Sequence, residues 1–153
     1  MIITYTEGGT SVTGTATIVG TAVPVVNLFK VDDADIALGC RINSSGAAVS
    51  YRDGQLVTGW IEAKVGDTFT VTSDKAYDTS ENAYTGMCGT YKSDKSLIMQ
   101  IYAGDWNNGW DTTKTIGSIT ITDNILNTDH SSIGYVRFCI EYTDINSIVI
   151  TKE

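Results

Sequence analysis

Gly134-Tyr135-Val136-Arg137-Phe138-Cys139-Ile140-Glu141-Tyr142 is the stretch that decides the fold of this chain. Large apolar residues occupy every second position, and this period of two is typical of a β-strand with one face in a core. The residues predicted to face that core are Val136, Phe138, Ile140 and Tyr142. Arg137 and Glu141 are predicted to share the opposite face of the same strand.

The same alternation recurs along most of the sequence, and no segment shows a sustained helical period. In residues 68–72, Phe69 and Val71 are predicted to face the core, with threonines on the other face. The predicted strands span residues 15–19, 21–26, 36–42, 46–51, 56–63, 68–72, 84–92, 96–102, 114–122, 134–142 and 147–152. Short strands at this spacing predict an all-β fold, specifically an antiparallel, jelly-roll-like β-sandwich.

Turns and polar segments separate these strands. Asp53-Gly54 is a strong signal for a tight hairpin turn, because both central residues of such a turn favour positive φ. Polar loops are predicted at residues 73–83, 103–113 and 123–132, the last with a helical turn as one alternative. In the strand between the last two loops, the core candidates are Ile116, Ile119 and Ile121.

Two segments of unequal size are expected. Residues 25–153 have the length and apolar content of one sandwich domain. Residues 1–24 are rich in Thr and Gly and end at Pro24, so they are predicted to form an N-terminal β-arm or an outer strand. The first residues show neither the basic start nor the long apolar run of a signal peptide. We therefore expect the protein to be assembled in a cytoplasm, unless an earlier segment is removed.

The charge of the chain limits its partners. The net charge is −8, and Lys and Arg do not cluster. Nucleic-acid binding needs a basic surface that displaces counterions from phosphates, so neither nucleic acid nor an anionic membrane surface is an expected partner. No stretch approaches the roughly 18 apolar residues of a membrane helix.

The residues do not predict an enzyme, a bound metal or a cofactor. His130 is the only histidine, and it is interpreted as a solvated loop residue rather than a catalytic base. Asp32, Asp33 and Asp35 are interpreted as a solvated turn. The three cysteines, Cys40, Cys88 and Cys139, lack the spacing of a zinc site and are predicted to be reduced thiols.

The loop at residues 102–111 is the best candidate for ligand binding. Flat aromatic rings beside amides and carboxylates suit a sugar, whose ring stacks while its hydroxyls form hydrogen bonds. The candidate glycan-binding residues are Tyr102, Asp105, Trp106, Asn107, Asn108, Trp110 and Asp111. Two alternative interpretations of this loop stay open. In the first, the tryptophans form a lid on the core. In the second, the oxygens bind calcium, although the glycine comes too early for the common calcium loop.

Several segments resemble a known group of domains. They are Asn27-Leu28-Phe29-Lys30 and residues 41–47, 56–68, 90–95 and 135–138. In this order they resemble the carbohydrate-binding-like β-sandwich domains of structural proteins in tailed phages and prophages. The resemblance covers residues 27–151. It implies a head-decoration, head-fibre or tail-fibre protein, but it supplies no binding residue.

The expected function is therefore that of a non-enzymatic protein on the surface of a tailed-phage particle. Capsid decoration through the N-terminal arm is expected first, because a tail adhesin usually needs a long shaft ahead of its tip. The implied partners are the major capsid protein or other virion proteins and further copies of the chain, and the implied location is the virion, assembled in the bacterial cytoplasm. The alternative is a tail-fibre adhesin that binds host surface glycans through residues 102–111.

The glycan hypothesis predicts that Trp106→Ala or Trp110→Ala lowers glycan affinity at least tenfold, about 1.4 kcal/mol, because the sugar loses its stacking surface. Glycan-array binding and titration calorimetry measure this. The melting temperature is expected to change little. A large drop in melting temperature would instead identify the tryptophans as core residues.

Overall fold

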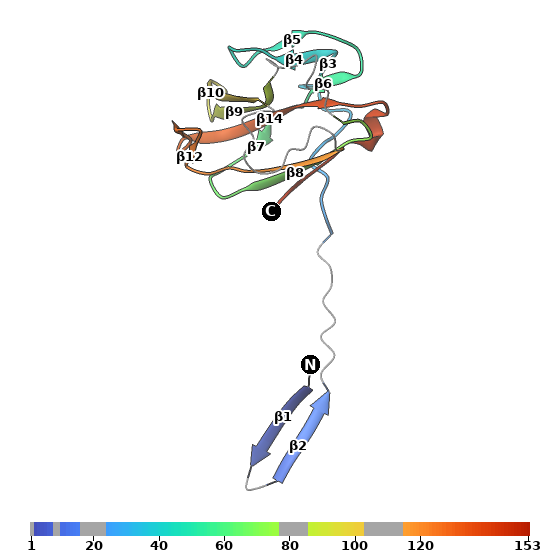
Figure 1. The fold of residues 1–153 in the computed structure, drawn as a ribbon, viewed down its shortest axis with the longest axis vertical. Helices are drawn as coiled ribbons and strands as arrows, with labels where there is room; N and C mark the ends of the chain where they lie inside the picture. The colour runs from blue at the N-terminus through green and yellow to red at the C-terminus, as the bar shows by residue number, and fades with distance from the viewer. Residues whose placement is uncertain (1, 8–9, 16–23, 77–85, 103–114) are drawn as a thin grey trace.

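A computed structural model describes residues 2–7, 10–15, 24–76, 86–102 and 115–153 (Figure 1). Within these ranges every paired strand is antiparallel to its neighbours, and no α-helix is present. The predicted all-β, antiparallel class is confirmed.

The strands follow one another with short connections. In chain order they are β1 (Ile2–Glu7), β2 (Thr10–Thr15), β3 (Ala37–Leu38), β4 (Cys40–Ile42), β5 (Ala48–Ser50), β6 (Gln55–Val57), β7 (Ile61–Glu62), β8 (Thr68–Thr72), β9 (Gly86–Lys92), β10 (Leu97–Tyr102), β11 (Ile116–Thr120), β12 (Asn124–Ile125), β13 (Thr128–Asp129), β14 (Ile133–Glu141) and β15 (Val149–Lys152). One 3₁₀ turn, η2 (Ile145–Ser147), precedes β15.

Strand β14 organises the larger sheet. Tyr135 pairs with Tyr91 of β9 on one side and with Glu62 of β7 on the other. Further along, β14 pairs with β6, while β9 also pairs with β10 and β4. The stretch chosen from the sequence is therefore a central strand.

A smaller sheet of order β11-β8-β15 shares a core with β14. The rings of Phe69 and Phe138 meet in this core with centroids 5.7 Å apart. Figure 1 shows β8 on one side of β14 and the β3–β6 region on the other. The predicted inward residues are confirmed: Phe69, Val71, Val136, Phe138 and Ile140 are buried, and Tyr142 is half-buried against them.

One of the three isoleucines predicted for the core is exposed. Ile119 and Ile121 are buried, but 49% of Ile116 is accessible to solvent. Strand β11 alternates its faces, so residues an odd number of positions apart cannot both point inward. The prediction was wrong for Ile116 because it ignored this parity.

The Asp53-Gly54 turn is present, but the strands that flank it do not pair with each other. Gly54 has a φ of +72°, as the turn requires. Strand β5 pairs with β4, whereas β6 pairs with β3. Strands β5 and β6 therefore lie along the same segment, which holds β3 and β4, and residues 51–54 bulge out between β5 and β6. The hairpin turn instead lies at residues 43–47, where the Asn43 Oδ1 accepts from the N–H groups of Ser45 and Ala47.

Two other predicted segments differ in the structure. The expected strand at residues 56–63 is interrupted after Val57. Gly59 lies in this interruption and approaches Asp33 closely, since an alanine Cβ at this position would lie 2.0 Å from the Asp33 carboxylate. The expected loop at residues 123–132 contains the β12–β13 hairpin, with Leu126 and Asn127 at φ of 49° and 62°. Asn favours this conformation, while Leu adopts it only because the hairpin imposes it.

Asn27 fastens the start of the sandwich to its last strand. Its side-chain amide donates to the Ile148 carbonyl (3.0 Å), and its Oδ1 accepts from the Ile150 N–H (2.9 Å). The Leu28 N–H also donates to the Ile150 carbonyl (2.8 Å). Before Asn27, residues 24–26 are exposed and do not form the strand expected there, while residues 16–23 lie outside the described ranges.

The N-terminal strands β1 and β2 pair with each other in a two-stranded sheet of their own. Figure 1 draws this hairpin apart from the larger sheets.

Asn27→Ala is expected to lower the free energy of unfolding by about 1–3 kcal/mol, because it removes side-chain hydrogen bonds to β15. Chemical denaturation measures the loss. Val26→Ala is the matched control, since 68% of Val26 is already exposed. Equal effects of the two substitutions would contradict the role given to Asn27.

Candidate functional site

Of the predicted glycan-binding residues, only Tyr102 lies within the described ranges. Tyr102 ends β10, where its backbone pairs with Gly86. Asp105, Trp106, Asn107, Asn108, Trp110 and Asp111 lie outside the described ranges. Glycan binding by this loop stays a prediction.

The outer face of the larger sheet holds a buried cluster of charged side chains. Arg137 and Glu141 lie on the face opposite the core, as the alternation predicts, yet only 6% and 1% of them are exposed. The alternation pattern alone did not indicate this burial. It arises because segments distant in sequence meet these side chains: Asp35, Thr58 and Trp60 contact Arg137, and Arg52 and Lys75 contact Glu141.

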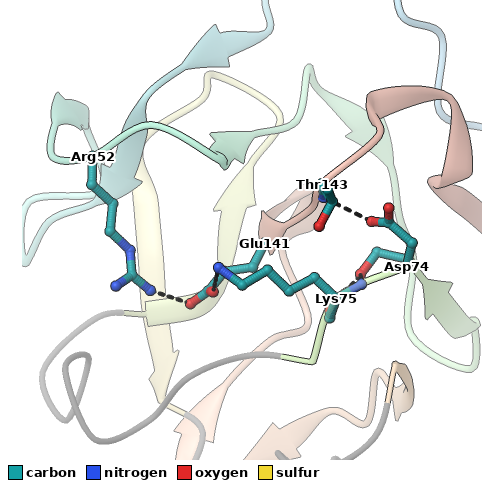
Figure 2. A network of polar contacts seen from close by, with 6 residues as sticks. Arg52, Asp74, Lys75, Glu141 and Thr143 are labelled. Atoms are coloured by element: carbon teal, nitrogen blue, oxygen red, sulfur yellow. Dashed lines mark hydrogen bonds and ion pairs between the residues drawn. The ribbon is translucent and has the colours of Figure 1, made fainter.

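Glu141 lies between two cations (Figure 2). Arg52, in the bulge after β5, donates to its Oε1, and the Lys75 ammonium lies 3.0 Å from its Oε2. The carboxylate is fully buried, whereas a quarter of the Arg52 side chain and nearly half of the Lys75 side chain reach solvent. The partners therefore compensate the buried charge while they remain partly hydrated.

Asp74 fixes the segment that carries Lys75. Its carboxylate accepts from the backbone N–H groups of Thr143 and Asp144, each at 2.8 Å. These bonds, first among them the one from Thr143, lower the pKa of Asp74. The segment after β8 is thereby tied to the end of β14, which sets the position of Lys75 beside Glu141 (Figure 2).

Gln55 borders the same cluster. It is the cross-strand partner of Glu141 and is fully buried. Among the described residues, neither its amide nitrogen nor its amide oxygen has a hydrogen-bond partner. A buried water molecule is the usual way to satisfy such a pair of atoms.

Trp60 lies within a second cluster on the outer face. Its ring meets the edges of Tyr91 and Tyr135, with centroids 4.8 and 6.0 Å away. The charged ends of Arg137 and Lys95 lie over the ring at 4.7 and 4.9 Å. Trp60 is therefore a half-buried residue of the sheet face, and the neighbouring cations occupy space that a stacked ligand would need.

Arg137 and Tyr91 are both held by backbone carbonyls. Arg137 donates through Nε to Thr58 (2.7 Å) and through Nη2 to Asp35 (2.8 Å), and burial lowers its pKa. The Tyr91 hydroxyl donates to the Gly46 carbonyl (2.8 Å), and burial raises its pKa to about 12. These bonds stabilise the sheet rather than prepare a reactive group.

The interpretation of His130 as a solvated residue was wrong. Its side chain is completely buried. Nδ1 donates to the Thr128 carbonyl (2.7 Å), since a carbonyl can only accept, and Nε2 lies 3.0 Å from the Thr90 hydroxyl. The prediction failed because the sequence neighbours of His130 are polar, which is typical of an exposed loop. In the structure His130 connects β13 to β9.

An open groove lies where β7 meets β14. It encloses about 440 Å³ and is lined by Glu62, Lys64, Ser93, Tyr135 and Lys152, among others. The Lys152 ammonium lies 3.3 Å from the Asp67 carboxylate and donates to the Glu62 carbonyl (3.2 Å). The lining is mainly polar, and this ion pair explains the position of Lys152 without a ligand.

The cysteines and the aspartates at residues 32–35 are the remaining predicted residues that the structure describes. Cys40, Cys88 and Cys139 are free thiols, and burial raises the pKa of Cys88. Asp32, Asp33 and Asp35 are exposed, as expected for a solvated turn. Within the described part of the chain, no three His, Cys, Asp or Glu side chains are grouped as metal ligands would be.

The described part of the chain contains no helix with the length and apolar character needed to cross a membrane.

Comparison with known proteins found no matching family model, no matching curated protein and no matching solved structure.

Glu141→Gln is expected to lower the free energy of unfolding by about 2–4 kcal/mol, because it leaves Arg52 and Lys75 without their shared counter-charge. Denaturant titration measures the change. Glu153→Gln, at an exposed position, is the control and is expected to change stability by less than about 0.5 kcal/mol. A Glu141→Gln protein as stable as the control would show that the cluster contributes no stability.

Proposed function

We propose that the chain is a non-enzymatic surface protein of a tailed-phage particle that decorates the capsid through its N-terminal β-arm. The observation that carries the proposal is the β1–β2 hairpin, which forms a two-stranded sheet of its own. An isolated two-stranded hairpin is at best marginally stable in water, because it exposes two strand edges and lacks a core. Pairing with another chain supplies the missing strand and stabilises the hairpin.

Residues 27–153 form the other part of the proposed arrangement. Among the side chains that the structure describes, the hydrophobic cluster is drawn from residues 28–150, and Asn27 is hydrogen-bonded to Ile148 and Ile150. The chain thus combines a hairpin that lacks a third strand with a folded domain that begins at Asn27. Such a combination suits a particle-surface protein, in which one part is the anchor and the other faces outward. The resemblance of residues 27–151 to domains of phage structural proteins supports the choice of particle.

The polar clusters support a structural role rather than catalysis. Glu141, Arg137 and His130 are buried, and each is bound to protein groups. A catalytic site needs a nucleophile or base that a substrate can reach, with a stabilising group beside it. The adhesin alternative depends on residues 102–111, most of which lie outside the described ranges.

Deletion of residues 1–15 is expected to abolish attachment to particles of the phage that encodes the chain, while the sandwich keeps its melting temperature. Attachment is measured by co-sedimentation with purified particles and by electron microscopy of the particle surface. Val26→Ala, at the exposed start of the sandwich, is the control and is expected to attach normally.

Normal attachment after the deletion would contradict the proposal. Loss of folding after the deletion would also contradict it, because the hairpin would then be part of the sandwich. Density at the tail tip instead of the head lattice would favour the adhesin.

A further inference from the structure

Strand β11 forms one edge of the smaller sheet. It pairs with β8 over its whole length, from Ile116 to Thr120, without a register shift. Among the described residues, no strand pairs with the other side of β11. The opposite edge of the same sheet is covered, because the Leu28 N–H donates to the Ile150 carbonyl of β15. The smaller sheet is therefore open to a further strand along β11.

The hydrogen bonds at the two ends of β11 indicate which of its backbone groups point away from β8. The Thr115 carbonyl accepts from the segment after β8 (2.9 Å), and the Ile121 N–H donates to the segment before it (2.8 Å). The odd-numbered residues therefore bond to the β8 side. Successive residues of a strand direct their backbone groups to opposite sides. The N–H and C=O groups of Ile116 and Thr120 thus point outward from the sheet.

The sequence of β11 lacks the features that keep an edge strand unpaired. Such strands usually carry a proline, a lysine or a bulge, or are very short. In the larger sheet, β10 contains two register shifts, and β3, β5 and β7 have three residues or fewer. Residues 116–120 include no proline and no charged residue, and they pair regularly with β8. Their edge is therefore suited to pairing with another strand.

We propose that β11 of one copy pairs with β11 of a second copy, antiparallel and across a two-fold axis. In this arrangement Ile116 of each copy lies opposite Thr120 of the other, and each such pair exchanges both of its outward N–H···O=C hydrogen bonds. The product is one continuous sheet of order β15-β8-β11-β11-β8-β15.

The charge of the chain favours this contact between copies. Two chains that each carry a net charge of −8 repel each other, so they approach most easily where neither surface is charged. Strand β11 is uncharged, and so are its neighbours on the outer face of β8, Thr68, Thr70 and Thr72. Copies that meet edge to edge along β11 therefore bring no like charges together within these strands.

The side chains of the two strands also fit each other in this register. On the inner face, Gly117 of one copy lies opposite Ile119 of the other, so two large side chains do not meet there. On the outer face, Ile116 lies opposite Thr120, and β-branched residues pair well across strands. In the single chain 49% of Ile116 is exposed, and the contact removes part of this aliphatic surface from water.

Sedimentation of the full chain tests the inference. Analytical ultracentrifugation at about 1–100 μM protein is expected to show a monomer–dimer equilibrium. Ile116→Pro and Thr120→Pro each remove an outward N–H and are each expected to weaken dimerisation at least tenfold, about 1.4 kcal/mol, while the hydrogen bonds to β8 remain. If Thr120→Pro melts early, Ile116→Pro decides, because the first residue of a strand tolerates proline.

Val65→Pro is the matched proline control. Val65 precedes Gly66, whose φ is +98°, in a turn closed by a hydrogen bond from the Asp67 N–H to the Lys64 carbonyl. Proline is favoured at this position of such a turn, so the substitution leaves β11 unchanged. The Val65→Pro chain is expected to dimerise like the unsubstituted chain. Proline variants of β11 that dimerise as strongly as this control, or an unsubstituted chain that is monomeric at about 100 μM, would overturn the inference.

A mixture of two full-length chains identifies the occupant of the edge. Labelled Ile116→Pro chain, mixed with unsubstituted chain, is expected to enter mixed dimers at least tenfold less than labelled Val65→Pro chain does. The Ile116→Pro chain keeps its β1–β2 hairpin. Mixed dimers as abundant as in the control would therefore show that the hairpin or another segment occupies β11, and the inference would be wrong.

The inference goes beyond the proposed function, which concerns the hairpin, and the two fail separately. If the chain dimerises through β11 but never attaches to particles, the inference stands and the proposed function is wrong. If the chain attaches to particles through its arm but stays monomeric in solution, only the inference is wrong.

Discussion

The two-sided burial of β14 is the constraint on which the rest of the structure depends. On one face Phe138 meets Phe69 of the smaller sheet. On the other, Arg137 donates to the carbonyls of Asp35 and Thr58. Glu141 on that same face lies between Arg52 and Lys75. A strand buried on both faces must satisfy each polar group that it carries, because an unpaired buried charge costs several kcal/mol. The bulge that carries Arg52 and the turn that carries Lys75 meet this requirement.

This requirement explains several irregular features of the larger sheet. The break after Val57 lets the Thr58 carbonyl accept from Arg137, while the Thr58 hydroxyl accepts from the Phe138 N–H. The excursion at residues 51–54 brings Arg52 to Glu141. An uninterrupted hairpin would remove Arg52 from Glu141 and the Thr58 carbonyl from Arg137. The irregularities are thus a consequence of charge burial, and they give the outer layer its shape.

The polar clusters of the described residues are turned inward, where each charged side chain is bound to protein groups. Among the described residues, the β1–β2 hairpin is a sheet without a third strand. Under the proposed function, that hairpin is the part of the chain that contacts another protein. A particle coat, in which many copies lie close together, is a setting in which such contacts act in number.

The sequence by itself determined the fold class and the inward faces, because alternation with a period of two follows from strand geometry alone. Phe69, Val71, Phe138 and Ile140 were placed correctly on this basis. Only the tertiary structure decided which outward faces become covered. Arg137 and Glu141 alternate with core residues and His130 has polar sequence neighbours, yet the burial of all three depends on segments distant in sequence. Local pattern encodes which way a side chain points, whereas long-range packing decides what it meets there.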